Sequence, residues 1–295
     1  MSDLTLFSQI LWTSLANSSY QVLFTISFAL VLKVLGVWNF TQPALMAGSF
    51  YCMYIAIDTL GMPPLAGFVI STLFTVAFAC AIEGVAFRTL RNRNSSSIAF
   101  FIFTIVMSQF VIYLLTLIFT AEPRFLFGNM TSTVYVVASV YITSWDITAL
   151  LTTVTLVLAL YLFLNFTGPG QFMIAVADNA ELAETYGINK NRYFFLTMLI
   201  AAIFISTGTF LFGGKIAFYP ELSLHMMLFA VAATIIGGIG SIFGASAAAV
   251  VIVVLQQMSV LIIGSRWQPL FVFAILFVTI VLASKGLRFR AFSMK

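Results

Sequence analysis

The charged side chains that most clearly suggest a function in this chain are the carboxylates of Asp178, Glu181 and Glu184. They are three of only nine acidic residues in the sequence, and all three lie in one polar stretch, Gly168–Arg192, between long apolar segments. A soluble-looking acidic helix in a chain with so little charge elsewhere indicates a docking surface for a soluble partner. The stretch itself contains no histidine or cysteine.

Catalytic and cofactor motifs are absent from the sequence. His225 is the only histidine, no HExxH or GxSxG pattern occurs, and one histidine beside Glu221 makes a poor zinc site. The glycines at Gly238, Gly240 and Gly244 give GxGxxxG rather than the GxGxxG of dinucleotide-binding proteins, and no lysine follows them as in a P-loop. We therefore predict no catalytic residue, no metal site and no cofactor in this chain, and no ATPase motif.

The remaining reactive side chains have structural interpretations. Cys52 and Cys80 both fall in apolar runs, where cysteine usually serves as a small apolar residue. Glu83 lies near Arg88 and Arg91, and because an unpaired carboxylate is costly in a membrane segment, an ion pair is expected.

The composition indicates that this chain lies in a lipid bilayer. It is 62% hydrophobic and 7% charged, against about 25% charged residues in soluble domains. The apolar runs extend over about 20 residues, the length of a membrane-spanning helix, and a helix satisfies its own backbone hydrogen bonds in lipid. The expected fold is an all-α integral membrane protein, a polytopic bundle of about 8–10 transmembrane helices that includes short or broken helices. A net charge of +4 beside apolar spans does not indicate nucleic acid.

Nine apolar segments are predicted, and the second and seventh are short for a full crossing. They are Ile10–Leu32, Pro43–Ile57, Pro64–Phe87, Ile98–Phe119, Ile147–Leu164, Tyr193–Phe212, Met226–Ile236, Ala245–Ile263 and Gln268–Ala283.

Basic residues predict the orientation. If the loop with Arg88, Arg91 and Arg93 is cytoplasmic, only Arg124, Lys215 and Arg266 of the 13 basic residues lie on the other side. This bias follows the positive-inside rule and predicts an external N-terminus and a cytoplasmic C-terminus.

The chain reads as one domain, 1–295, that includes the cytoplasmic loop 168–192. An external loop from Ala121 to Asp146 has room for a short interfacial helix, and Trp145 near its end suits an aromatic belt.

Two helix breaks border the short segments. The first runs from Gly36 to Pro43, and proline suits the first turn of the helix that follows it. The second, Gly237–Gly244, contains four glycines. Discontinuous helices indicate a substrate path in transporters; the alternative is a tight turn with close helix packing. The predicted path residues are Asn39, Phe40, Gln42, Gly237, Gly238, Gly240 and Ser241.

Within the polar stretch we expect one helix from about Gln171 to Tyr186, ended by Gly187 in the left-handed conformation. A helix lying on lipid headgroups usually carries lysine and arginine, whereas this one carries acids, which favours docking to a protein. The predicted contact residues include a stripe spaced as one helical face; they are Ala175, Asp178, Asn179, Leu182, Ala183, Tyr186 and Gly187.

Three regions resemble the permease subunits of ABC transporters for branched-chain amino acids, the Liv type. They are the segment Leu30–Gln42 with Asn39-Phe40, the segment Glu83–Arg91, and the run from Gly170 through Ala177-Asp178-Asn179 to Gly187, continued by Gly237–Ala245. The resemblance extends in order over nearly the whole chain. The chain departs from the family pattern at Pro43, Thr89 and Gln171.

The resemblance implies an ATP-driven importer in the bacterial inner membrane. Its other parts would be a homologous permease subunit, identical or not, two cytoplasmic ATPase subunits that bind ATP and Mg, and an extracytoplasmic substrate-binding protein. The polar helix would then seat in an ATPase and convert closure of the ATPase pair into a switch of the permease.

Other interpretations remain open at this point. The substrate could be a branched-chain or related amino acid, or urea or a short amide. A stand-alone secondary transporter would need an ion-coupling carboxylate deep in a span, and apart from Glu83 the spans have none. An intramembrane enzyme lacks a catalytic constellation.

Overall fold

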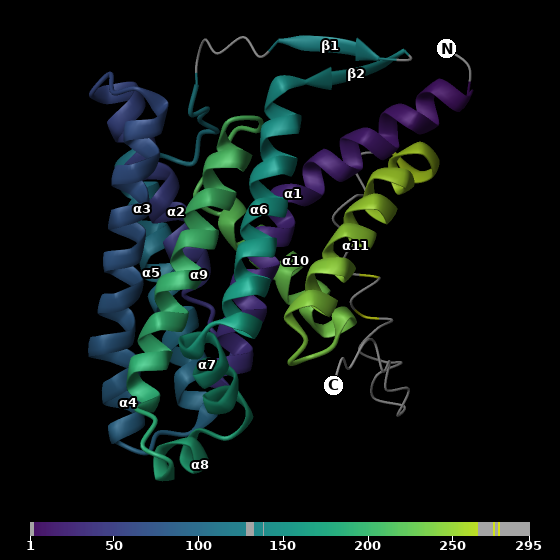
Figure 1. Cartoon of the computed structure of the whole chain (residues 1–295). Coiled ribbons are helices and arrows are strands. Elements are labelled where there is room, and N and C mark those ends of the chain that lie inside the picture. The colour runs from purple at the N-terminus through teal and green to yellow at the C-terminus, as the bar shows by residue number, and fades with distance from the viewer. Residues whose placement is uncertain (1–2, 128–132, 138, 265–273, 275–276, 278–295) are drawn as a thin grey trace.

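The described part of the chain is almost wholly helical, as predicted (Figure 1). A computed structural model describes residues 3–127, 133–137, 139–264, 274 and 277. The elements in order are α1 (Asp3–Leu35), α2 (Gln42–Tyr54), η1 (Ile55–Thr59), α3 (Pro64–Ala81), η2 (Ile82–Phe87), α4 (Arg88–Asn92), α5 (Ser97–Phe119), β1 (Val134–Val137), β2 (Val140–Thr143), α6 (Ser144–Phe166), α7 (Gly168–Asp178), α8 (Ala180–Thr185), α9 (Lys190–Gly213), α10 (Leu222–Gly237) and α11 (Ile242–Ile263).

Each of the first eight predicted apolar segments is a helix. Six helices of the described residues are long and apolar enough to cross a membrane. The two segments predicted to be short are short: α2 has 13 residues and α10 has 16. The ninth predicted segment, Gln268–Ala283, lies almost entirely outside the described residues.

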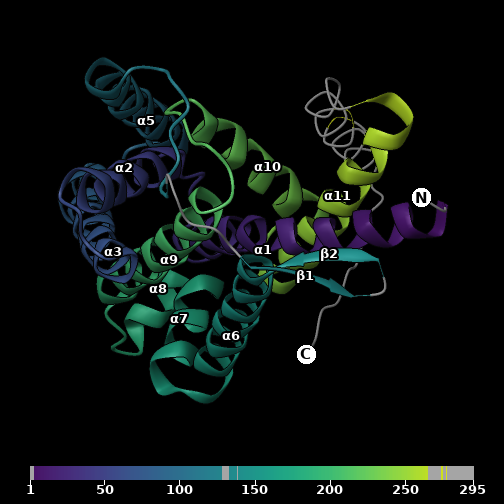
Figure 2. The same cartoon turned by 90° about the horizontal axis from the view of Figure 1, so that it is seen from above.

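Helix α1 forms the centre of the bundle. Its 33 residues extend over about 50 Å, more than the roughly 30 Å of a hydrocarbon core, so it crosses at a tilt. The view from above shows α6, α9, α10 and α11 arranged around it (Figure 2). In its most apolar window 89% of the residues are buried, against 22% for α5 and for α6. Helices α5 and α6 therefore expose most of their side chains at the surface of the bundle.

Polar side chains on α1 hold the neighbouring helices. The Gln21 side-chain amide donates to the Met226 carbonyl of α10 at 3.1 Å, and the Ser27 hydroxyl donates to the Ala201 carbonyl of α9 at 3.1 Å. From α6, the Thr153 hydroxyl donates to the carbonyl of Ser19 at 3.2 Å. Such interhelical hydrogen bonds contribute about 0.6 kcal/mol each in membrane proteins. These buried polar residues of α1 therefore act as helix–helix contacts.

Basic residues are more numerous at one end of the bundle than at the other, as the predicted orientation requires. Helices α4, α7 and α8 lie at one end, and the β1–β2 hairpin lies at the other (Figure 1). The arginines of α4 and the lysine that begins α9 belong to the first end, whereas Arg124 pairs its backbone with Phe218 at the second. The basic residues from 285 to 295 lie outside the described residues, so the cytoplasmic C-terminus stays a prediction.

The loop predicted to be external contains a β-hairpin, where the sequence left room for a short interfacial helix. Strands β1 and β2 pair in an antiparallel register in which Val136 faces Tyr141 and Val134 faces Thr143. The run is rich in valine, threonine and tyrosine, whose branched and aromatic side chains favour strands. The expected helix is wrong because β-propensity prevails here.

The turn between α10 and α11 requires glycine at several positions. Gly238 and Gly240 have φ of +97° and +95°, a region that side chains with a Cβ rarely adopt. A Cβ on Gly237 would lie 2.3 Å from the backbone of Gly244, so the two helices meet backbone to backbone. Ser241 caps α11 by accepting from the Gly244 N–H at 3.1 Å.

We predict that Gly237→Ala destabilises the protein by about 3 kcal/mol or more, because backbone atoms cannot rotate away from the added methyl group. Thermal unfolding of the detergent-solubilised protein measures this. Gly84→Ala is the control, since a Cβ there meets no atom within 4 Å, and it should unfold at nearly the wild-type temperature. Equal stability of both variants would contradict the close backbone contact between α10 and α11 at Gly237.

Candidate functional site

The candidate site is the pair of short helices α7 and α8 at the predicted cytoplasmic end (Figure 1). Thr167 begins α7: its hydroxyl accepts from the Gly170 N–H at 3.1 Å and donates to the Phe163 carbonyl of α6 at 2.6 Å. A Cβ on Gly170 would lie 2.0 Å from that same carbonyl oxygen. Helix α7 is thus held tightly against the end of α6.

The polar stretch contains two helices, and the predicted single helix from Gln171 to Tyr186 is wrong. Asn179 leaves the helical conformation, with φ −158° and ψ +102°. Its side-chain oxygen accepts from the Leu182 N–H at 2.9 Å and so caps α8. Asparagine competes well for this role because its short side chain satisfies a free N–H at a helix start.

Gly187 ends α8 as predicted. Its φ is +82°, and its N–H donates to the Glu184 carbonyl at 3.0 Å. The Ile188 N–H donates to the Ala183 carbonyl at 3.1 Å, which completes a Schellman motif. Lys190 then forms an ion pair with Glu184 at 2.7 Å, so the connection into α9 is fixed by local contacts.

The predicted contact residues divide between the surface and the interior. Leu182 and Tyr186 are 54% and 79% exposed, whereas Ala183 is only 5% exposed. Ala175 is half-buried. The expected single stripe is therefore wrong, because the break at Asn179 rotates α8 relative to α7. Asp178, Asn179, Glu181 and Gly187 are exposed. The surface presented at this end, which we call the α7–α8 surface, consists of Asp178, Asn179, Glu181, Leu182, Tyr186 and Gly187.

The opposite side of α7 is packed against the bundle. Met173 and Val176 are at most 1% exposed. Their spacing of three residues places them on one face of the helix, a pattern in the sequence from which burial of that face could have been predicted. Phe172 meets the ring of Tyr193 on α9 with centroids 6.1 Å apart. Displacement of α7 therefore has to move its neighbours as well.

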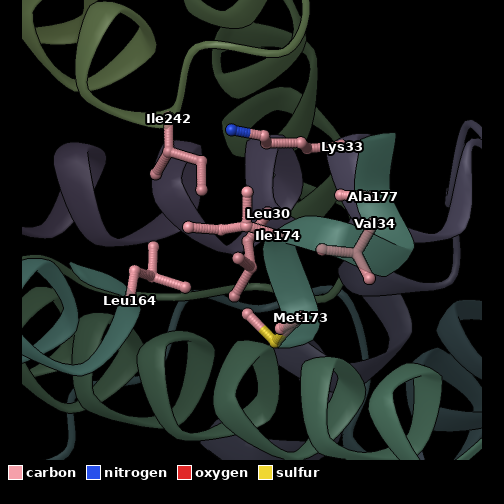
Figure 3. Close-up of a pocket in the computed structure, with 8 residues that line it drawn as sticks. All are labelled: Leu30, Lys33, Val34, Leu164, Met173, Ile174, Ala177 and Ile242. Atoms are coloured by element: carbon pink, nitrogen blue, oxygen red, sulfur yellow. The ribbon is translucent and has the colours of Figure 1, made fainter. Parts of the chain in front are cut away.

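A shallow apolar groove separates α7 from α1. Figure 3 shows the Lys33 ammonium at one edge of the groove, extended toward Ile242 rather than toward α7. The lining residues are Leu30, Lys33 and Val34 of α1, Leu164 of α6, Met173, Ile174 and Ala177 of α7, and Ile242 of α11.

A second contact at this end joins α4 to α9. Arg91 forms the expected ion pair with Glu83, which is 2% exposed, and its guanidinium lies 4.7 Å from the ring centroid of Phe194. Arg88, the other predicted partner, is exposed. Because Phe194 lies one turn into α9, the Glu83–Arg91 pair links η2 and α4 to the helix that follows α8.

The first helix break uses its polar residues locally. Gly36 has φ +68°, and Pro43 lies in the first turn of α2 as predicted. Asn39 is fully buried; its oxygen accepts from the Thr41 N–H at 3.0 Å and hydroxyl at 2.6 Å. Its amide nitrogen lies 3.7 Å from the Met198 sulfur of α9. Within the single chain, Asn39 therefore stabilises a turn.

The neighbouring path candidates have different surroundings. Gln42 is 2% exposed, and its side-chain nitrogen has no partner among the described residues. Phe40 is half-buried and packs edge-on against Phe101 of α5, with centroids 5.4 Å apart. In the second break Gly237 is buried, while Gly238, Gly240 and Ser241 are partly exposed.

Groups that could hold a metal ion are absent from the described residues, where no cluster of three or more histidine, cysteine, aspartate or glutamate side chains occurs. A bundle of apolar helices, six of them long enough to cross a bilayer among the described residues, defines a multi-pass membrane protein with a small polar helical pair at one end.

Comparison with known proteins defines the family. Residues 10–281 match the profile described as "Branched-chain amino acid transport system / permease component". This match covers most of the chain, so the protein belongs to that family of permease components, and the family resemblance predicted from the sequence is confirmed.

Curated relatives align over nearly their full length. The high-affinity branched-chain amino acid transport system permease protein BraD of Pseudomonas aeruginosa is 26% identical over 97% of both chains. The corresponding permease protein LivH is 26% identical in Salmonella typhimurium and in Escherichia coli K12, over 95% of both chains in each case.

One solved structure has a similar fold. The chain resembles a chain of PsaBC from Streptococcus pneumoniae, determined in complex with Fab, with a TM-score of 0.53 at 13% identity. The likeness covers 92% of this chain and 94% of that chain. At that identity it supports the arrangement of helices alone.

We predict that Gly170→Ala lowers transport at least tenfold while the protein still inserts into the membrane. The added methyl group would meet the Phe163 carbonyl and push α7 off α6. Gly168→Ala is a matched control, because Gly168 opens the same helix and a Cβ there meets nothing within 4 Å. Substrate uptake, normalised to the amount of protein in the membrane, measures both. An equal loss of uptake in both variants would contradict the close contact between Gly170 and the end of α6.

Proposed function

We propose that this chain is one membrane subunit of an ATP-driven importer for branched-chain or related amino acids. The observation that carries the proposal is the full-length match to permeases named for that transport, together with an exposed helical pair at the predicted cytoplasmic end. The chain has no ATPase motif, so the proposal assigns ATP and Mg to two partner ATPase subunits. A second permease subunit and an extracytoplasmic binding protein complete the assembly, in the inner membrane of a bacterium.

The proposed coupling element is the α7–α8 surface. It is supported by the exposure of Leu182 and Tyr186, which offer an apolar anchor and an aromatic anchor, the kinds of residue that contribute most to protein interfaces. The acidic residues Asp178 and Glu181 flank them and suit a basic partner surface. Ala183 is buried and Ala175 is half-buried, so these two residues of the predicted contact set contribute little or only part of their surface to docking.

The proposed translocation path follows the two helix breaks. Asn39, Phe40 and Gln42 belong to the first break. Gly237, Gly238, Gly240 and Ser241 form the second. Support comes from the buried side-chain nitrogen of Gln42, which has no hydrogen-bond partner in the described part of the chain and is therefore available to a ligand, and from the partly exposed Gly238 and Gly240.

Uptake measurements test the proposal. Cells that lack this gene and cells that carry it would be compared for uptake of radiolabelled leucine, with collapse of cellular ATP as the control for energy coupling. We expect ATP-dependent leucine uptake only when the gene is present. Uptake of labelled urea but not of leucine would instead identify a short-amide importer and overturn the amino-acid assignment.

We predict that Leu182→Ala combined with Tyr186→Ala lowers uptake at least tenfold, since loss of about 1.4 kcal/mol of docking energy weakens binding tenfold. The ATPase subunits should also co-purify less with the variant. The matched control is Leu158→Ala on α6, because Leu158 and Leu182 are both 54% exposed but Leu158 faces lipid. Normal uptake in the double variant would show that the α7–α8 surface is not the coupling element.

A further inference from the structure

The external hairpin leaves its outer strand uncovered. All four side chains of β1, from Val134 to Val137, are 52–61% exposed. Because successive side chains of a strand point to opposite faces, both faces of β1 are open. Tyr141 on β2, opposite Val136, is 56% exposed as well.

The sequence around the hairpin is free of charge. From Phe125 to Trp145 there is no aspartate, glutamate, lysine or arginine. A water-facing ribbon of a membrane protein normally carries charged residues, particularly on an edge strand. Here valine, threonine and tyrosine take their place, and tyrosine is enriched where a membrane meets water.

The hairpin continues the exposed apolar surface of α6. Strand β2 ends at Thr143, which caps α6, so no loop intervenes. The exposed side chains of α6 include Ile147, Leu151 and Val154, at 38%, 64% and 63%. The exposed apolar surface therefore continues from the hairpin onto α6. The one charged residue between them in sequence, Asp146, is buried and paired with Lys215 at 2.6 Å.

Hydrogen bonds fix where the hairpin lies. The Gln9 side chain of α1 accepts from the Tyr141 N–H at 2.7 Å and donates to its carbonyl at 3.1 Å. Thr143 and Asp146 close a capping box at the start of α6. Both strands consequently lie across the ends of the helices, roughly in the plane of a membrane that the helices cross (Figure 1).

We propose that the β1–β2 hairpin lies within the external headgroup layer of the bilayer, with phospholipid as the partner that covers it. The polar layer on each side of the hydrocarbon core is about 5–8 Å thick, comparable with a single ribbon. Such a layer surrounds both faces of a strand and also supplies water for the free backbone groups of its outer edge. The hairpin would thus anchor the external end of α1 through Gln9.

Two protein partners fit less well. A soluble binding protein stacked on the hairpin would cover one face and leave the other in water. It would also have to expose a matching apolar patch whenever it is free in solution. A second copy of this chain paired along β1 would cover the edge but not both faces. Lipid is always present and covers all of these surfaces.

Site-directed fluorescence quenching tests the proposal on the full chain in proteoliposomes. Cys52 and Cys80 are replaced by alanine, and an environment-sensitive probe is attached to Val136→Cys or Val137→Cys, whose side chains point to opposite faces. Vesicles contain phosphatidylcholine spin-labelled either in the headgroup or near the top of the acyl chain. Controls are Glu122→Cys, exposed at the same end, and Val154→Cys on the lipid face of α6.

We expect both hairpin positions to be quenched by the spin-labelled lipids at least threefold more strongly than the Glu122 position, and to be shielded from aqueous iodide. Quenching no stronger than at Glu122 would overturn the proposal. Quenching at only one of the two positions would also overturn it, because a ribbon immersed in the headgroup layer is surrounded by lipid on both faces.

Discussion

The constraint on which this structure depends is that every helix end inside the protein needs partners for its free backbone groups. Lipid provides none, and an unpaired group in the hydrocarbon costs several kcal/mol. The chain meets this need with short polar side chains. Ser241 accepts from the N–H three residues further on at 3.1 Å, and at the predicted aqueous end Thr167 and Asn179 form the same kind of cap at 3.1 and 2.9 Å. Asn39 does the same two residues on.

This constraint gives the polar residues of the helix breaks a structural role before any functional one. Asn39 and Ser241 are polar residues beside apolar segments, Asn179 lies in the polar stretch, and each of the three closes a turn or caps a helix. A cap and a binding role are compatible, because a helix start that is held open leaves further N–H groups for a ligand. These hydrogen bonds show that the helix breaks are stabilised by specific side chains of the chain itself.

Much of the fold was predictable because it follows from local chemistry and the solvent. Apolar runs located the helices, Pro43 and Gly187 marked helix ends, and basic residues separated the two ends of the bundle. The β-hairpin was also predictable in principle, from the alternation of valine and tyrosine, whereas at most a short interfacial helix was expected in that loop.

The candidate site was less predictable, because burial depends on partners far away in sequence. A stripe drawn through Ala175, Asn179 and Ala183 assumes a continuous helix, and one side-chain hydrogen bond at Asn179 removes that assumption. Once the helix breaks, periodicity no longer relates its two halves. Which side of α8 is then buried depends on its contacts with α7 and α9, and the positions of these helices cannot be derived from the periodicity of the stretch.

Helix α1 connects the two surfaces that are proposed to meet other molecules. Among the described elements it contacts α7 near one end and β2 near the other. Met173 and Val176 are fully packed, and Gly170 meets the backbone of α6. A force on α7 cannot be absorbed by compressing such contacts, because close-packed interiors are nearly incompressible. It must instead shift α1 and α6 as rigid bodies. Since β2 runs directly into α6 and is bonded to α1 through Gln9, the hairpin ties the external ends of both helices together and restricts how far one can move without the other.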